Sequence, residues 1–141
     1  LINSISSGNL SISPSICYEI AFPQLIRKTA SESNLLVTIS NDTWFGSSYG
    51  PIQHLEIAQN RALEHKKAIL RSTNTGISAF ISNNGKILEK QGYFEDKILK
   101  REVNLYEGKT FYAKYGNLPL YFILSVIFII ILILKSKKEI D

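Results

Sequence analysis

The sequence predicts an α/β domain with a mixed sheet, followed by one apolar helix that could cross a membrane. Short β-branched runs alternate with stretches of helical periodicity through the first half of the chain. An Asn-Gly turn within residues 83–86 then joins two further short runs as a hairpin, which adds antiparallel pairs to a parallel sheet. Near the C-terminus, Leu118 to Leu134 are almost wholly apolar.

The first elements are a polar loop, a strand and a helix. Asn3–Gly8 is small and polar, which is typical of a loop, and Leu10–Ile16 is predicted as a strand. Pro14 lacks a donor for the hydrogen-bond ladder, so it indicates a sheet edge or a strand end. A helix is predicted over Ile20–Ser31, with Pro23 in its first turn, where proline is tolerated.

The later elements alternate again before the sheet is completed by short strands. Helical spacing of Leu55, Ala58, Ala62 and His65 predicts the second helix, and Lys66 with Lys67 predicts its solvated end. In order, we expect a strand at Leu35–Ser40, a loop at Asn41–Gly50, a helix from Pro51 to about Lys67, and strands at Ala68–Thr73, Gly76–Ser82, Ile87–Gln91 and Ile98–Leu105. Helices from one layer leave an apolar sheet face, for which we expect a partner layer outside this chain.

Length and composition limit the organisation and the partners. The chain has 141 residues and no Met, so we expect a fragment with one partial domain at 1–117, a membrane helix at 118–135 and a tail at 136–141. The net charge of +4 is spread along the chain, which argues against nucleic-acid binding. One cysteine excludes an internal disulfide and a Cys-cluster metal site, and two separated histidines do not suggest zinc.

The apolar C-terminal run is predicted to span a membrane. The alternative is a buried core helix, but a core helix of so small a domain usually keeps one polar stripe, and this run is apolar on all sides. Lys135, Lys137 and Lys138 favour a cytoplasmic C-terminus, which places the preceding domain on the outer side of the membrane.

Cys17 is the first candidate for chemistry because it lies where the first strand turns towards a helix. A thiolate nucleophile needs a base or cation and donors for an oxyanion, and N–H groups at a helix start could supply the donors. The alternative is a small buried hydrophobe. Glu19 is either a first-turn acid that favours the helix dipole or a brace for the hinge against Arg61 or Arg71.

The loop Asn41–Gly50 concentrates three aromatic residues, Trp44, Phe45 and Tyr49. They form either a substrate-facing lid or part of the domain's own core, and the sequence leaves both open. As single residues, Arg61 and Arg71 fit ordinary exposed arginines on a helix surface and at a strand end. Glu95-Asp96 is interpreted as a solvated pair and not as an acid–base dyad.

Six segments resemble, in order, the apolipoprotein N-acyltransferase family of the nitrilase, or carbon–nitrogen hydrolase, superfamily. They are Ser15–Glu19, Ser40–Gly46, Gly50–His54, Arg61–Glu64, Leu70–Gly76 and Tyr112–Asn117. The resemblance implies the C-terminal half of a nitrilase-type α-β-β-α sandwich followed by one transmembrane helix. It implies a multi-pass protein of the bacterial cytoplasmic (inner) membrane, with the catalytic domain on the periplasmic side.

The implied activity is acyl transfer through a cysteine thioester, with no cofactor and no metal. A membrane phospholipid is the acyl donor, and the N-terminal S-diacylglyceryl-cysteine of a diacylated apolipoprotein is the acceptor. The resemblance makes Cys17 the nucleophile, with the Tyr18 backbone N–H as oxyanion donor and Glu19 in support. It further implies substrate contacts from the loop and structural support from arginines. These residues are Asn41, Trp44, Phe45 and Tyr49 for the substrate, and Arg61 and Arg71 for support.

The family also uses a glutamate base and a lysine upstream of its cysteine, and neither has a counterpart in the residues before Cys17. We therefore expect the 141 residues alone to be inactive. Two alternatives stay open: a membrane-anchored carbon–nitrogen hydrolase that cleaves small amides, and a non-catalytic membrane-anchored binding module.

Overall fold

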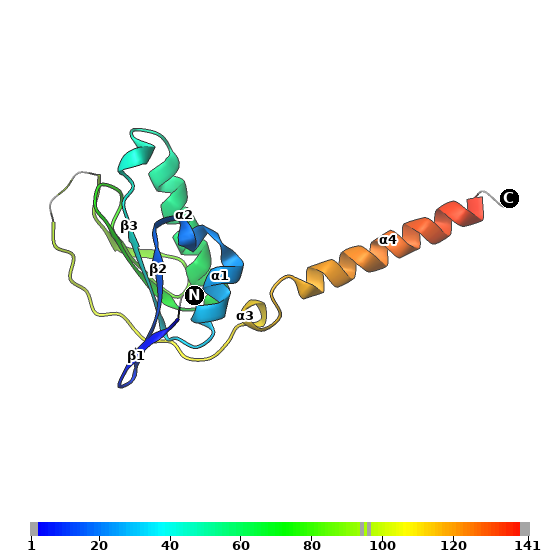
Figure 1. Cartoon of the computed structure of the whole chain (residues 1–141), viewed down its shortest axis with the longest axis horizontal. Helices are drawn as coiled ribbons and strands as arrows, with labels where there is room; N and C mark the ends of the chain where they lie inside the picture. Colours follow the sequence, from blue (N-terminus) through cyan, green and yellow to red (C-terminus); the bar gives the residue numbers. More distant parts are fainter. Residues whose placement is uncertain (1–2, 94, 96, 139–141) are drawn as a thin grey trace.

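A six-stranded mixed sheet forms the centre of the domain (Figure 1). The computed structural model describes residues 3–93, 95 and 97–138. The strands are β1 (Ile5–Ser7), β2 (Leu10–Ile16), β3 (Leu35–Ser40), β4 (Ala68–Thr73), β5 (Ala79–Ile81) and β6 (Ile87–Lys90). Their spatial order follows the chain, with β2, β3 and β4 parallel and antiparallel pairs on either side. The predicted mixed α/β fold is confirmed.

Two helices cover one face of this sheet (Figure 1). The helical elements are the 3₁₀ turns η1 (Cys17–Ala21) and η2 (Thr43–Phe45) and the helices α1 (Pro23–Ala30), α2 (Gly50–His65), α3 (Phe111–Tyr115) and α4 (Leu118–Lys138). The core lies between α1, α2 and the sheet. The predicted periodic residues Leu55, Ala58, Ala62 and His65 are all buried, because they recur on the single stripe of α2 that faces the strands.

Two predicted elements near the N-terminus were wrong at their boundaries or in kind. The expected N-terminal loop contains β1, which pairs with β2 through a hairpin at Gly8, whose φ is +55°. Ile20–Ala21 belong to a 3₁₀ turn, and α1 begins only at Pro23. Phe22 is extended because a residue before proline avoids the helical region.

The last predicted strand, Ile98–Leu105, is also wrong, because these residues form no strand. The segment instead runs along the sheet face opposite α1 and α2 (Figure 1). There Leu99 lines a pocket together with Val37, Leu70 and Phe80. Contact with an apolar sheet face has taken the place of edge pairing with β6.

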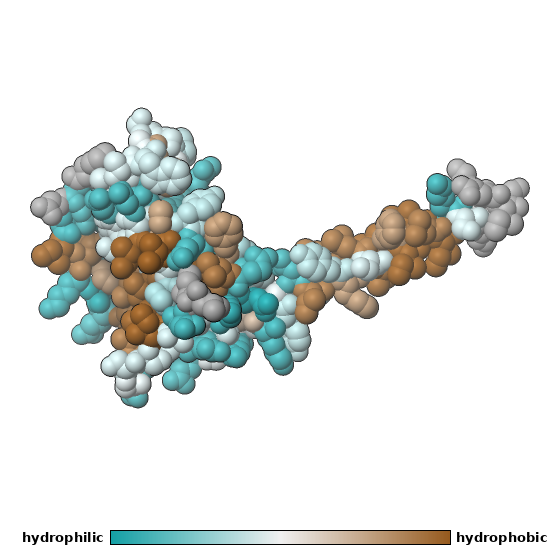
Figure 2. All heavy atoms as spheres, in the orientation of Figure 1, coloured by the Kyte–Doolittle hydropathy of each residue, from teal (hydrophilic) through white to brown (hydrophobic). Residues whose placement is uncertain are grey.

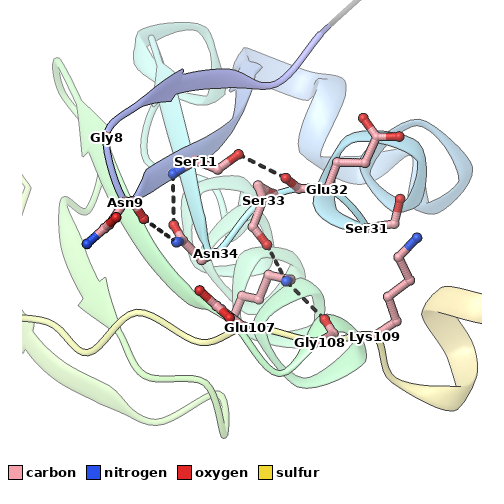
Figure 3. Close-up of a pocket in the computed structure, with 11 residues that line it drawn as sticks. Gly8, Asn9, Ser11, Ser31, Glu32, Ser33, Asn34, Glu107, Gly108 and Lys109 are labelled. Carbon is pink, nitrogen blue, oxygen red and sulfur yellow. Dashed lines mark hydrogen bonds between the residues drawn. The ribbon is translucent and has the colours of Figure 1, made fainter.

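Lys67 corrects another expectation, because it is only 2% exposed and not part of a solvated helix end. Its ammonium group donates to the carbonyl oxygens of Ser33, Tyr106 and Gly108. Lys67 lines an open polar pocket of about 450 Å³, whose other lining residues are labelled in Figure 3. Burial lowers the pKa of Lys67, with an opposing effect from Glu107. The helix ends at His65, and the left-handed Lys66 follows it as the cap.

The sheet face without helices remains partly open, and Pro14 lies at an edge of the sheet. Pro14 pairs with Val37 of β3, whereas on the other side of β2 the pairing with β1 reaches only as far as Ile12, the partner of Ile5. Pro14 therefore lies where β2 is an edge strand, as its missing donor predicted. Ile16 and Ile39 on this face are mostly exposed, so the described residues cover the apolar face only in part.

The C-terminal helix α4 projects away from the domain (Figure 1), and Figure 2 shows apolar side chains along most of its length. Residues 118–136 of α4 are long and apolar enough to cross a membrane, and none of that stretch is buried. The short helix α3 precedes it and is fixed to α1 by Arg27, which donates to the carbonyl oxygens of Ala113 and Lys114. These bonds fix α3, the element just before α4, to the body of the domain.

Candidate functional site

The candidate site lies where the parallel strands β2, β3 and β4 end. Their carboxyl ends meet at one edge of the sheet, which is where α/β sheets place their ligand sites. Cys17 follows β2 directly and is half-buried. Its φ of +53° is in the left-handed region, which costs a non-glycine residue about 1–2 kcal/mol. The sulfur is thus presented on a strained turn between a strand and the 3₁₀ helix η1.

A buried acid, Asp42, lies behind this turn at the end of β3. Its carboxylate accepts hydrogen bonds from Ser40 Oγ at 2.6 Å and Arg71 Nη2 at 2.7 Å, and Oδ1 lies 3.0 Å from His54 Nδ1. The side chains of Asp42 and Arg71 are fully buried. The parallel register, in which Thr38 pairs with Arg71, brings the acid and the arginine together from two strands.

His54 connects this buried pair to Cys17. It projects from α2, and its Nε2 lies 3.2 Å from the Cys17 carbonyl oxygen, while Arg71 Nη2 lies 3.3 Å from its Nδ1. Burial lowers the pKa of His54 and Arg71 adds to the effect, while Asp42 opposes it. Burial also lowers the pKa of Arg71, again opposed by Asp42.

The arginines differ from the expectation of ordinary exposed residues. Arg61 is only 8% exposed and Arg71 only 3%. Arg61 donates through Nε to the Ile20 carbonyl at 3.1 Å and through Nη1 to Glu64. Both guanidinium groups compensate for burial with several acceptors, so they hold η1 and the strand ends in place.

Glu19 braces the hinge, but not against an arginine as expected. Its Oε2 accepts a hydrogen bond from the Ile16 N–H at 2.6 Å. That bond connects the first turn of η1 to the last residue of β2, so it closes the chain around Cys17, which lies between the two residues. The Tyr18 ring is half-exposed and packs edge-on against Phe22, with ring centroids 5.8 Å apart.

The aromatic loop after β3 is largely exposed. Trp44 is 69% exposed and Tyr49 is 75% exposed, so the alternative that they pack in the core is wrong for both. Phe45 is half-buried, stacks on Trp44 at 4.7 Å between ring centroids, and has its edge towards His54 at 5.9 Å. Asn41 Oδ1 accepts from the N–H and Oγ1 of Thr43, so this side chain shapes the loop itself.

An apolar pocket of about 600 Å³ opens beside this loop and is lined by residues 46–49, Ile52 and Tyr93. Glu95 lies nearby in the chain and is exposed, while Asp96 lies outside the described residues. Within the described ranges, no group of three or more His, Cys, Asp and Glu side chains is placed to hold a metal ion.

Sequence reasoning missed Asp42 and His54. Both lie inside segments that carried the resemblance, but an acid in a loop and a lone histidine on a helix have no local signal that predicts their contact. The available signal was topological: two parallel strands ending at the same edge place the residues that follow them side by side.

Comparison with known proteins places this geometry in context. Residues 3–111 match the carbon–nitrogen hydrolase family. The chain is 46% identical over 119 residues to the apolipoprotein N-acyltransferase of Photobacterium profundum, covering 84% of this chain and 23% of that protein. It is 45% identical over 136 residues to the one from Wigglesworthia glossinidia brevipalpis, covering 96% of this chain and 27% of that protein. The chain thus spans about a quarter of the length of these curated relatives.

Solved structures share the fold at lower identity. Nit3 of Saccharomyces cerevisiae, a nitrilase-superfamily member, matches with a TM-score of 0.61 and 20% identity, over 68% of this chain and 38% of that one. An amidase from Nesterenkonia sp. matches with a TM-score of 0.55 and 19% identity, over 65% of this chain and 37% of that one. With its α/β fold, its strand-end cysteine and a family match over most of its length, this chain belongs to the carbon–nitrogen hydrolase family.

Proposed function

We propose that this chain carries the nucleophile and part of the substrate loop of an N-acyltransferase. The enzyme would move a fatty acyl chain from a membrane phospholipid to the N-terminal S-diacylglyceryl-cysteine of lipoproteins. One observation carries the proposal: a half-buried cysteine on a strained strand-end turn shares a chain with an unburied apolar helix. Relatives named apolipoprotein N-acyltransferase, 40–46% identical, support it.

The reaction has two balanced steps. The Cys17 thiolate attacks the ester carbonyl of the phospholipid, the acyl C–O bond breaks, and the lysophospholipid leaves as an alcohol with the proton that the thiol lost. The lipoprotein amine then attacks the thioester, an amide C–N bond forms, the C–S bond breaks, and the amine proton returns to the sulfur. A general base must reach the proton that it removes, and the proposal takes this base, a glutamate, and a lysine from the upstream segment that the family resemblance implies.

The hinge residues would serve the tetrahedral intermediate of each step. The backbone N–H of Tyr18 would donate to the oxyanion. Glu19 would keep that turn in place through its bond to the Ile16 N–H. Arg61 and Arg71 would support the same turn from the interior of the domain. Arg61 would do so through the Ile20 carbonyl, and Arg71 through the buried Asp42.

The exposed aromatic loop would contact the acyl chain. Trp44 and Tyr49 leave much apolar area in water beside the apolar pocket of about 600 Å³, and Asn41 and Phe45 fix the loop that carries them. Trp44→Ala should slow acyl transfer from a long-chain phospholipid without changing thiol alkylation at Cys17. Unchanged acyl transfer in Trp44→Ala would remove this role.

We further propose that residues 1–117 belong to the catalytic domain, 118–135 cross the bacterial inner membrane, and 136–141 lie in the cytoplasm. The three lysines after Leu134 support this orientation, because positive charge is enriched on the cytoplasmic side. The catalytic domain would then face the outer side, where α3 and Arg27 hold it near the membrane surface.

The test uses the intact gene product in detergent micelles with a phospholipid labelled in its acyl chain. We expect a covalent label that hydroxylamine removes and that Cys17→Ser does not acquire. Hydrolysis of small amides by a protein that takes no label would support the amidase alternative. A protein that shows neither reaction would support the non-catalytic binding module.

A further inference from the structure

We propose that His54 is a positioning residue that aims the Tyr18 N–H at the reacting carbonyl by holding the Cys17–Tyr18 peptide. The proposal rests on the proposed function, because it concerns the acyl-enzyme at Cys17. It assigns His54 a role distinct from both the nucleophile and the base.

The argument begins with the shared peptide unit. The Cys17 carbonyl and the Tyr18 N–H belong to one planar peptide, in which the two groups point in opposite directions when the bond is trans. The structure contains no cis peptide bond among its described residues. His54 is 2% exposed, and its Nε2 lies 3.2 Å from the Cys17 oxygen. The carbonyl is therefore directed to the interior, and the Tyr18 N–H is directed away from His54.

That N–H is available for a ligand. In a 3₁₀ helix each N–H bonds to the carbonyl three residues earlier, so the N–H groups of Cys17 and Tyr18 precede the first bond within η1. The positive φ of Cys17 makes this turn strained. A strained peptide keeps its orientation only when its surroundings fix it, and His54 supplies that contact from the α2 side.

The protons of the imidazole fit this role in both charge states. A carbonyl oxygen only accepts, so Nε2 carries the hydrogen that reaches Cys17. In the neutral ring Nδ1 accepts from Arg71 Nη2 at 3.3 Å, and in the charged ring it donates to Asp42 Oδ1 at 3.0 Å. The buried Asp42–Arg71 pair therefore holds the far side of the ring while the bond to Cys17 persists.

The same geometry argues against His54 as the base for the thiol. Its Nε2 is committed to the carbonyl oxygen of Cys17, and its Nδ1 faces Asp42 and Arg71. A general base must reach the proton that it removes. His54 acts on the reaction only through the peptide that it holds.

Two substitutions separate positioning from packing. The amide nitrogen of Gln occupies nearly the place of Nε2, so His54→Gln keeps a donor for the Cys17 carbonyl, whereas Asn reaches only the place of Nδ1. His65→Gln is the matched control, because His65 is also buried on α2 but its ring lies against Tyr112, far along the helix from Cys17.

The experiment measures two reactions at the same sulfur of the intact gene product. Single-turnover acylation by a p-nitrophenyl ester or by labelled phospholipid needs the oxyanion donor, whereas alkylation by iodoacetamide does not. We expect His54→Asn to slow acylation about 10- to 100-fold, below the loss for a deleted oxyanion donor. Alkylation should stay within about two-fold, since the thiol keeps its surroundings. His54→Gln should recover most of the acylation rate, and His65→Gln should match the wild type.

Equal losses in His54→Asn and His54→Gln, or a parallel loss of alkylation, would overturn the positioning role. If the wild type is acylated by the nitrophenyl ester but not by phospholipid, the proposed function fails while the comparison of the two variants still decides on His54. A wild type acylated by neither ester would overturn both.

Discussion

Removing the buried carboxylate of Asp42 should destabilise the domain strongly. Asp42 and Arg71 lie 2.7 Å apart with fully buried side chains. At an effective dielectric constant of about 20, their attraction is about 6 kcal/mol before desolvation is subtracted. Arg71 Nη1 already lacks a hydrogen-bond partner among the described residues, and besides Asp42 the guanidinium contacts only two neutral groups, the Ile77 carbonyl through Nε and His54 Nδ1 through Nη2. Most of the compensation for this buried charge therefore comes from Asp42.

We expect Asp42→Asn and Arg71→Met each to lower the free energy of unfolding by about 3–5 kcal/mol, because each leaves one buried charge uncompensated. The double variant should lose less than the sum, with a coupling energy of about 1–3 kcal/mol. For a domain of this size the single variants should lower Tm by at least about 12 °C.

The assay is thermal unfolding of the purified protein in detergent, followed by far-UV circular dichroism. Glu64→Gln is the matched control, because the Arg61–Glu64 pair is partly exposed and should be worth at most about 1 kcal/mol. A loss below about 1 kcal/mol in Asp42→Asn, or additive losses in the double variant, would refute the argument that this pair is a compensated buried charge.

Three further predictions concern other parts of the fold. Burial, followed by nearby cations, lowers the pKa of His65 to about 4. The unfolded state then binds more protons than the folded state, so stability present above about pH 6.5 should fall by at most about 3 kcal/mol towards pH 4 in denaturant titrations, and His65→Gln should remove that dependence. Gly116→Ala should lower Tm more than Gly8→Ala. Both glycines have a φ near +55°, but only at Gly116 would the added Cβ be crowded, since it would lie 3.2 Å from the side chain of Arg27. Lys67→Met should cost about 1–3 kcal/mol in denaturant unfolding, against less than about 0.5 kcal/mol for Lys66→Met.

Each of these comparisons has an outcome that contradicts it. The burial of His65 would be wrong if wild type and variant lose stability in parallel as the pH falls. Crowding at Gly116 would be wrong if both glycine variants melt together. The buried ammonium would be wrong if the two lysine variants have the same stability.

Local patterns predicted much of the fold. The strands β2, β3 and β4 have the bounds that the apolar runs predicted, and α2 differs by one or two residues at each end. These elements depend on periodicity and on composition over a few residues, which are properties of the sequence itself. β1 escaped prediction because all three of its residues are exposed, so its strand follows from the hairpin with β2 and not from a buried stripe.

The sequence by itself therefore determined which segments form the central strands and which helix is long and apolar enough to cross a bilayer, and it singled out Cys17 as the candidate for chemistry. Only the tertiary structure decided the surroundings of that residue. Charged side chains are exposed by default, and Asp42, His54 and Arg71 become buried only because β3, α2 and β4 bring them within hydrogen-bond distance of one another. The free energy of burying such groups depends on partners distant in sequence, which no local pattern contains.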